Sequence, residues 1–302
     1  MNLAPIILFV YNRKWHTEET INALKKNHLA FKSELFIYSD GPKTNKDLDK
    51  VNNVRQYLKT IKGFKKVTII KQEKNQGLAI SIISGVTEII NKYGKVVVLE
   101  DDLVTSPYFL NFMNAALDYF EDNEKVWHIS GWSIPIEINN RSDIYFYRVM
   151  NCWGWATWSK NWKYFERNTG KLINQFSIND IKHFNIDDAN NNFWKQVLLN
   201  HKNKLETWAI FWYAAIFKNN GLCLNPCKSF VKNIGFDGSG KHTFDLNYND
   251  NIELNSKDVI NFDIEIKEDK LIIDQIKSFY RNSNKNILIK LFDRVKIFLS
   301  RK

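Results

Sequence analysis

Three consecutive acidic residues directly follow a short apolar run in the stretch Val96-Val97-Val98-Leu99-Glu100-Asp101-Asp102. The apolar residues are valine and leucine, which is typical of a buried strand. Neighbouring carboxylates repel one another, and a hard divalent cation such as Mn²⁺ or Mg²⁺ would neutralise them. A cation held by one or two carboxylates usually completes its shell with phosphate oxygens. The stretch therefore predicts a cation and phosphate site at a strand end, with a solvated acidic turn as the alternative.

Similar apolar runs occur earlier in the chain, at residues 6–10, 35–38 and 67–70. Stretches with helical periodicity separate the four runs, at residues 17–26, 46–61 and 78–91. This alternation predicts an α/β fold with a mostly parallel central sheet flanked by helices. Because such sheets bind ligands at the carboxyl ends of their strands, the residues that follow each run are candidates for a binding site.

Polar residues also follow the other runs, as Tyr11-Asn12-Arg13, Ser39-Asp40-Gly41 and Asn75-Gln76-Gly77. Gly77 either lets the backbone approach a ligand closely or simply starts the next helix. The chain contains no GxGxxG and no GxxxxGK[ST] motif, which disfavours Rossmann dinucleotide-binding and P-loop proteins.

The composition is that of a globular protein with an excess of positive charge. The chain has 302 residues, a net charge of +10 and 14% aromatic residues, which together favour anionic partners and stacking surfaces. Its three cysteines are too few for a disulfide framework and predict free thiols in a reducing compartment. No apolar run reaches the roughly 20 residues that span a bilayer, and the start lacks a basic leader, so we expect a cytoplasmic location.

The second half contains a predicted helix at 107–121, a strand at 126–130, a helix at 206–220 that ends at Gly221, and a glycine-rich loop at 233–240. An aromatic run lies between them, with tryptophans at Trp153, Trp155, Trp158 and Trp162. Indole rings pack in cores or stack on sugar faces. We expect most of the four to lie in the core, and Trp153 and Trp155 to contact a ligand.

The end of the chain is basic and amphipathic. In residues 285–302 apolar side chains share one helical face, and lysines and arginines occupy the rest. The pattern predicts either a helix at a membrane surface or a helix packed on the core. Both interpretations stay open. The first would place the helix at the inner face of the cell membrane.

Four segments together resemble the nucleotide-sugar glycosyltransferases of GT-A fold. The chain is similar to bacterial family-2-like sugar transferases and, more remotely, to the N-acetylglucosaminyltransferase I family. The matching segments are, in order, Val10-Tyr11-Asn12-Arg13, Tyr38-Ser39-Asp40-Gly41, Glu100-Asp101-Asp102-Leu103 with Pro107, and Trp153-Gly154-Trp155. The resemblance covers residues 5–245. It implies a GT-A domain over 1–250, with a nucleotide-sugar half (1–105) and an acceptor half with a lid loop (106–250), followed by a C-terminal helical extension (251–302).

The resemblance also implies roles for individual residues. It makes Asp102 the ligand of Mn²⁺ or Mg²⁺, and Asp101 and Glu100 contacts of the ribose or the donor sugar. Arg13 and Asp40 match positions around a uracil ring, where an Asp accepts from N3–H and an Arg faces a carbonyl or phosphate. Tyr11 and Gly77 belong to the same expected nucleotide-sugar site. The alternatives are an ordinary turn at Asp40 and a solvated charge at Arg13.

Transfer with inversion needs a general base on the acceptor hydroxyl. The resemblance implies an acid near a tryptophan after the aromatic segment, and Glu206 lies there as a buried carboxylate at a helix start. Its alternative role is to complement the helix dipole. Asp237 in the glycine-rich loop is a second candidate base. Lys241 and His242, in the same loop, are expected to face the diphosphate, unless the loop is a surface loop without ligand contacts.

The predicted function is metal-dependent sugar transfer from a nucleotide-sugar, UDP-linked and with UDP-GlcNAc as one candidate. The acceptor is a glycan or lipid-linked hydroxyl in surface polysaccharide or glycoconjugate synthesis. An inactive carbohydrate- or nucleotide-binding module of the same fold is the alternative. Nucleic-acid binding is disfavoured because the basic residues are spread along the chain without a known module. A sugar-1-phosphate nucleotidyltransferase would need a glycine- and arginine-rich N-terminal loop, which is not seen.

Overall fold

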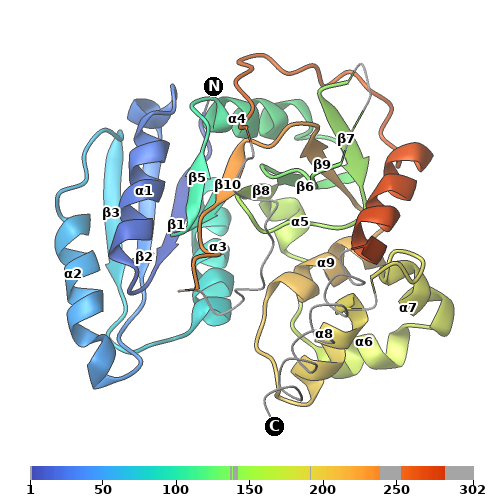
Figure 1. Cartoon of the computed structure of the whole chain (residues 1–302), viewed down its shortest axis with the longest axis horizontal. Helices are drawn as coiled ribbons and strands as arrows, with labels where there is room; N and C mark the ends of the chain where they lie inside the picture. Colours follow the sequence, from blue (N-terminus) through green and yellow to red (C-terminus); the bar gives the residue numbers. More distant parts are fainter. Residues whose placement is uncertain (1, 137, 139–141, 191, 239–252, 283–302) are drawn as a thin grey trace, which may run out of the picture.

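The computed structural model describes residues 2–136, 138, 142–190, 192–238 and 253–282. Within these ranges an eight-stranded sheet forms the centre, and helices cover both of its faces (Figure 1). Its strand order is β3 (Lys66–Lys71), β2 (Glu34–Ser39), β1 (Ile6–Val10), β4 (Lys95–Glu100), β8 (Trp155–Trp158), β6 (Val126–Ser130), β9 (Leu222–Pro226) and β7 (Ile144–Tyr147). Only β7 and β8 of these strands run against the others. The prediction of an α/β fold with a mostly parallel central sheet is confirmed.

The first four strands coincide with the four predicted apolar runs, each extended by at most one residue at either end. β1 pairs in parallel with both β2 and β4, and Phe9 is the register partner of Tyr38 on one side and Glu100 on the other. The ends of β1, β2 and β4 therefore meet at one edge of the sheet. That edge carries the polar residues that follow each run.

Two hydrophobic layers hold the helices against the sheet. One face packs against α1 (Lys14–Lys25), α2 (Leu48–Leu58) and α4 (Phe109–Tyr119). The other packs against α3 (Leu78–Tyr93), α5 (Ser159–Trp162) and α9 (Ala209–Lys218). Side chains along β1 point alternately to the two faces of the sheet, so Ile6 and Leu8 pack in the first layer and Ile7 packs in the second.

The remaining elements are short. The helical layer beside α9 consists of α6 (Thr169–Gln175), α7 (Ile178–Phe184) and α8 (Asn192–His201), as Figure 1 shows. Single 3₁₀ turns lie at η1 (Ala30–Lys32) and η2 (Asn45–Asp47). A separate antiparallel pair joins β5 (Leu103–Thr105) to β10 (Val231–Asn233). This pair brings the glycine-rich loop to the acidic turn.

Gly221 does not terminate α9, contrary to the prediction. The helix ends at Lys218, and Asn220 takes the left-handed conformation with φ +52°. Gly221 is required for another reason, since a Cβ there would lie 2.6 Å from Cγ of Trp127. The expected free thiols are found: Cys152, Cys223 and Cys227 are all unbridged.

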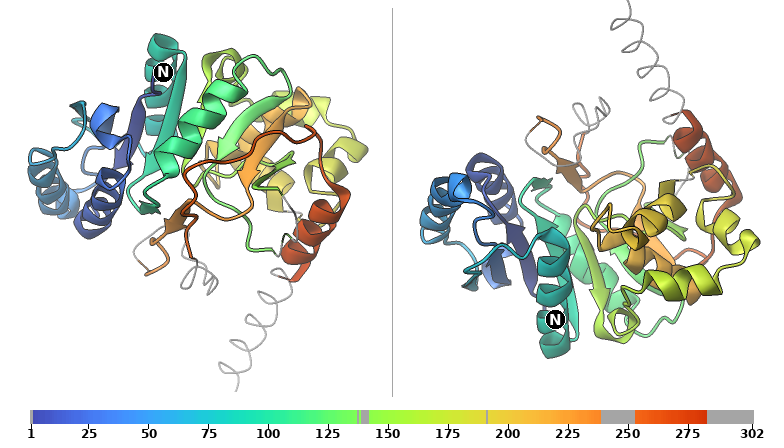
Figure 2. Two further views of the ribbon diagram at one scale, coloured as in Figure 1. Left: turned by 90° about the horizontal axis from the view of Figure 1, so that it is seen from above. Right: turned by 90° about the horizontal axis from the view of Figure 1, so that it is seen from below.

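The C-terminal extension packs on the core as a helix at 270–282, with Ile272, Ile273 and Ile276 buried. Figures 1 and 2 show this helix at the opposite end of the molecule from β3. The predicted basic helix at 285–302 lies outside the described residues. Among the helices that are described, none has the length and apolar character needed to cross a bilayer.

Candidate active site

The acidic turn is the structural centre of the carboxyl edge. Glu100 ends β4, and Asp101 and Asp102 form the turn into β5. Thr20 on α1 fixes this turn: its hydroxyl donates to the carbonyl oxygen of Asp101 at 2.8 Å and accepts from the backbone N–H of Leu103 at 3.1 Å. The carboxyl groups are thus held on a rigid backbone.

Arg13, the residue that precedes α1, bridges the two aspartates. Its Nη2 forms an ion pair with Oδ1 of Asp101 and another with Oδ2 of Asp102, the second at 2.8 Å. Burial disfavours the charged guanidinium, but the carboxylates of Asp101 and Asp102 outweigh burial and raise the pKa of Arg13. The sequence predicted Arg13 at this edge, and the structure joins it to the acids.

The acids are crowded and poorly solvated. Burial raises the pKa of Glu100 to about 8, and the charges of Asp102 and Asp101 add to that effect. Burial also raises the pKa of Asp101 to about 6, although Arg13 counteracts the shift. Loss of solvation therefore disfavours the charged forms, which a bound cation would stabilise.

One fully buried carboxylate oxygen of the acidic turn is unpaired within the described part of the chain. Oδ2 of Asp101 is buried and lacks a hydrogen-bond partner among the described residues, and the whole residue is only 5% exposed. No described group of three or more His, Cys, Asp or Glu residues is arranged to hold a metal. Two carboxylates with a buried, unpartnered oxygen fit a cation that takes its other ligands from water or phosphate.

The glycine-rich loop lies against this turn. The backbone N–H of Ile234 donates to the carbonyl oxygen of Asp102 at 2.8 Å. Oδ2 of Asp237 lies 3.1 Å from Nε2 of His16, a buried residue on α1. The described part of the loop, residues 233–238, therefore connects Asp102 with α1, and it brings the candidate base Asp237 to the same edge.

Gly235 lies so close to the Asp102 carboxylate that any side chain at this position would force the carboxylate or the loop to shift. A Cβ at this position would overlap Oδ2 and lie 3.0 Å from Cγ of Asp102. We expect Gly235→Ala to displace either the loop or the carboxylate and to lower kcat/KM for a reaction supported by the acidic turn by up to about 100-fold, the cost of a misplacement near 1 Å.

Gly170→Ala is the matched control for this substitution. A Cβ at 170 meets only Oδ1 of Asn168, at an ordinary 3.7 Å, so activity should remain at the level of the unsubstituted protein. If both variants keep full activity, the close contact between Gly235 and Asp102 is not needed for activity.

Asp40 is buried and holds together two turns. Its Oδ1 accepts from the N–H groups of Gly41 and Gln76, and its Oδ2 accepts from the N–H of Gly77 and the side-chain amide of Asn75, all at 2.8–2.9 Å. A carboxylate has about four acceptor positions, and all four are used. The predicted bond from uracil N3–H would have to displace one of these donors.

Gly77 is a helix-entry glycine. It precedes the first residue of α3 with φ +77°, and a Cβ there would meet nothing within 4 Å. Its backbone angle therefore explains it, because left-handed φ favours glycine. Tyr11 lies at the same edge, where its hydroxyl accepts from the N–H of Lys43 at 3.1 Å.

The two candidate tryptophans have different environments. Trp153 is half-buried and contacts Phe236 of the loop, with ring centroids 5.6 Å apart. Trp155 is 1% exposed and stacks on Trp208 at 5.1 Å and on His128 at 5.4 Å. The prediction that Trp155 contacts a ligand is wrong for this structure, because β8 lies in the middle of the sheet and its side chains are covered on both faces.

Glu206 does not have the predicted environment. Its side chain is 58% exposed and pairs with Arg167 at 3.3 Å, and α9 begins only at Ala209. It is therefore neither buried nor the first residue of a helix. Lys241 and His242 lie outside the described residues.

Two contacts at the acidic edge were missed from the sequence. Neither His16 nor Thr20 was predicted as a site residue, yet both face the acidic edge together with Arg13. Their spacing of three and four residues is the signal that was available, because such residues share one side of a helix.

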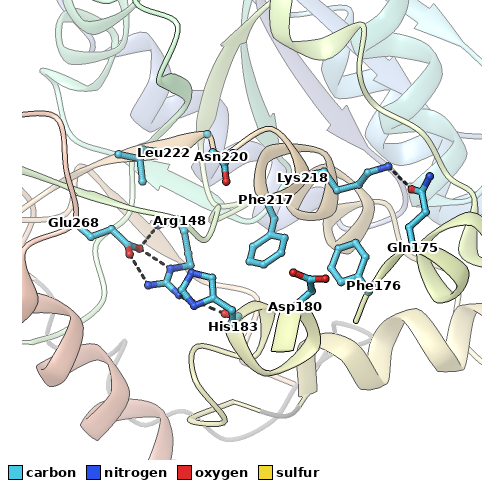
Figure 3. Close-up of a pocket in the computed structure, with 11 residues that line it drawn as sticks. Arg148, Gln175, Phe176, Asp180, His183, Phe217, Lys218, Asn220, Leu222 and Glu268 are labelled. Carbon is cyan, nitrogen blue, oxygen red and sulfur yellow. Dashed lines mark hydrogen bonds and ion pairs between the residues drawn. The ribbon is translucent and has the colours of Figure 1, made fainter. Parts of the chain in front are cut away.

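A cavity of about 410 Å³ lies away from the acidic turn, between α6, α7, the end of α9 and the C-terminal segment (Figure 3). Its charged groups mostly satisfy one another. Arg148 donates from Nε and Nη2 to Glu268 at 2.8 and 2.5 Å, and its Nη1 lies 2.6 Å from Nδ1 of His183. These contacts anchor the C-terminal segment to β7.

An α/β sheet of this order, with an acidic turn at its carboxyl edge, defines a protein of GT-A-like fold. The family model described as glycosyl transferase family 2 matches residues 6–190, so the chain belongs to this family of glycosyltransferases.

The chain is also similar to two solved structures. One is the mannosyltransferase PcManGT from Pyrobaculum calidifontis in complex with GDP-Man and Mn²⁺, at 12% identity, over 71% of this chain and 70% of that one, with a TM-score of 0.41. The other is S. aureus TarS, at 18% identity, over 46% of this chain and 23% of that one, with a TM-score of 0.31. No curated protein matches the chain.

Proposed function

We propose that the protein transfers a sugar from a UDP-linked donor to a hydroxyl of a glycan or lipid-linked acceptor, in the synthesis of surface polysaccharide or glycoconjugate. The observation that carries this proposal is the pair Asp101–Asp102, in which Asp101 is buried and its Oδ2 has no partner among the described residues. A buried carboxylate is costly without a cationic partner, and nucleotide-sugars bring a diphosphate that shares such a cation.

The carboxylate oxygens of the acidic turn suit Mn²⁺ or Mg²⁺ as ligands. Asp102 would hold the ion, with Asp101 beside it. Both ions prefer oxygen ligands and keep open positions for phosphate. When bound, such a cation would neutralise the negative charge of the nucleoside diphosphate leaving group. Arg13, already at this edge, supplies a second positive charge for the diphosphate.

In the proposed reaction the acceptor hydroxyl oxygen forms a bond to the anomeric carbon, and the bond from that carbon to the diphosphate breaks. The electron pair leaves with the nucleoside diphosphate, and the hydroxyl proton passes to a general base. Attack from the side opposite the leaving group inverts the anomeric configuration.

We assign the base role to Asp237. Its loop contacts Asp102, and its side chain is 43% exposed and so accessible to an acceptor. His16 orients the carboxylate through the contact at 3.1 Å. Glu206, the first candidate from the sequence, becomes the second, because its side chain is exposed and paired with Arg167.

A screen of nucleotide-sugars with Mn²⁺ tests the proposal, with hydrolysis of the donor and thermal shift as readouts. We expect turnover of a UDP-linked donor that requires Mn²⁺ or Mg²⁺ and is lost in excess EDTA. Full activity in EDTA would contradict the metal requirement. Binding of a donor without any turnover would favour the inactive binding module instead.

The proposal includes peripheral membrane contact through residues 285–302, supported by their alternation of apolar and basic side chains. We expect the full chain to sediment with vesicles that contain phosphatidylglycerol, and a chain ending at residue 284 to stay in the supernatant. Equal sedimentation of the two proteins would contradict this contact.

A further inference from the structure

A single guanidinium nitrogen bridges the two aspartates that a cation would need. Nη2 of Arg13 contacts both Oδ1 of Asp101 and Oδ2 of Asp102. All three side chains are largely buried, at 19%, 7% and 14% exposure, so the ion pairs are weakly screened by solvent. Arg13 thus uses two of the carboxylate oxygens that would ligate a metal.

The guanidinium does not satisfy the acids completely. Oδ2 of Asp101 stays buried and lacks a partner within the described part of the chain. A divalent ion carries twice the charge of Arg13 and binds several oxygens at once. The acid pair therefore suits a divalent ion better than it suits one arginine.

Arg13 is built so that its side chain can leave while its backbone stays in place. The residue precedes α1 with non-helical angles, φ −107° and ψ 82°. Its carbonyl oxygen accepts from the N–H of Thr17 at 3.0 Å and from the hydroxyl of Thr17 at 2.8 Å. The backbone is fixed by these bonds, whereas the side chain is held only by the two carboxylates in the contacts described.

We propose that Arg13 occupies the cation site in the donor-free protein and competes with the divalent ion for Asp101 and Asp102. A diphosphate offers the guanidinium an alternative anionic partner, and Arg13 then releases the carboxylates. Metal and nucleotide therefore bind cooperatively, and the metal alone binds weakly. This inference rests on the proposed function. It makes Arg13 a positioning residue, because Arg13 holds Asp101 and Asp102 in place until the cation and the diphosphate bind.

Binding of Mn²⁺ to the full chain, without and then with UDP, tests the competition. Electron paramagnetic resonance of free Mn²⁺ gives the affinity without any turnover. We expect Arg13→Gln to bind Mn²⁺ alone about 10-fold more tightly, the size of one partly buried ion pair. We also expect UDP to strengthen Mn²⁺ binding less in this variant than in the unsubstituted protein, because the coupling is reciprocal.

Lys14→Gln is the matched control. It removes the same charge one residue further along, but Lys14 is 52% exposed and pairs with Glu18 at 3.5 Å. Its Mn²⁺ affinity should change by less than about 2-fold, as for other exposed charges. If Arg13→Gln fails to fold, Arg13→Met replaces it, because an unbranched side chain of similar length also removes the charge and should raise the affinity for Mn²⁺ in the same way.

Unchanged or weaker Mn²⁺ binding in the Arg13 variant would overturn the inference, as would tight Mn²⁺ binding by the unsubstituted protein without UDP. A different result would contradict the proposed function. If no nucleotide-sugar is turned over while Arg13→Gln still binds Mn²⁺ more tightly, the competition stands and the transferase activity does not.

Discussion

Asp102→Asn is expected to lower kcat for sugar transfer by about 100- to 1,000-fold, with the fold intact. The substitution removes the charge that would hold the cation, and metal-based charge stabilisation of a leaving group contributes several kcal/mol. The carboxylate lies at the turn after β4, and its Oδ2 already pairs with Arg13. Release of UDP in the presence of Mn²⁺ measures the effect, and circular dichroism checks the fold.

Asp122→Asn is the control for Asp102→Asn, since it removes one acid from an exposed position. We expect full activity from it. An Asp102→Asn protein with undiminished turnover would show that the acidic turn is not where the reaction is supported.

Trp155→Ala is expected to lower the free energy of unfolding by about 3–5 kcal/mol, the usual cost of removing a large buried aromatic side chain. Trp155 is 1% exposed and packs against Trp208, His128 and Trp162. Urea denaturation followed by tryptophan fluorescence measures the change.

Trp153→Ala provides the comparison, because Trp153 is only half-buried, with edge contacts to Trp132 and to Phe236 of the loop. Its cost should stay near the ordinary 1 kcal/mol of a point substitution. An unchanged stability of Trp155→Ala combined with a raised KM for donor would restore Trp155 as a ligand contact.

The first half of the fold could be predicted because its signals are local. The strand at 6–10 was predicted without error, and 96–99 was extended by one residue at each end. Each apolar run is bounded by turn residues, and each helix between them has a clear period. Helix starts were less accurate: α1 begins at Lys14 rather than residue 17, since its first turn contains the exposed Lys14 and Trp15, which do not follow the apolar period.

The second half of the sheet was not predicted beyond β6, because its order depends on distant parts of the chain. β8 inserts between β4 and β6, and it runs against both. Nothing within the segment Trp155–Trp158 indicates that strands from 95–100 and 126–130 will flank it. The burial of Trp155 follows from this insertion, so it could not be inferred from the aromatic run alone.

The candidate site was predicted by residue type better than by contact. The acids and Arg13 were expected at one edge. The ion pairs of Arg13 with Asp101 and Asp102, which lie 88 and 89 residues further along the chain, were not expected. Asp40 was expected to accept a hydrogen bond from the uracil ring, whereas all acceptor positions of its carboxylate are used by backbone and side-chain amide donors. Side-chain partners depend on which turns come together, and a single sequence does not contain that information.

The hydrogen bonds of Asp40 have a consequence for affinity. They join the turn after β2 to the turn that enters α3, so these two segments form one wall whose shape exists before any ligand arrives. The conformational entropy of ordering that wall is lost during folding and not during association. A molecule that binds at this edge therefore meets a preorganised surface, and its dissociation constant is not weakened by the need to order it.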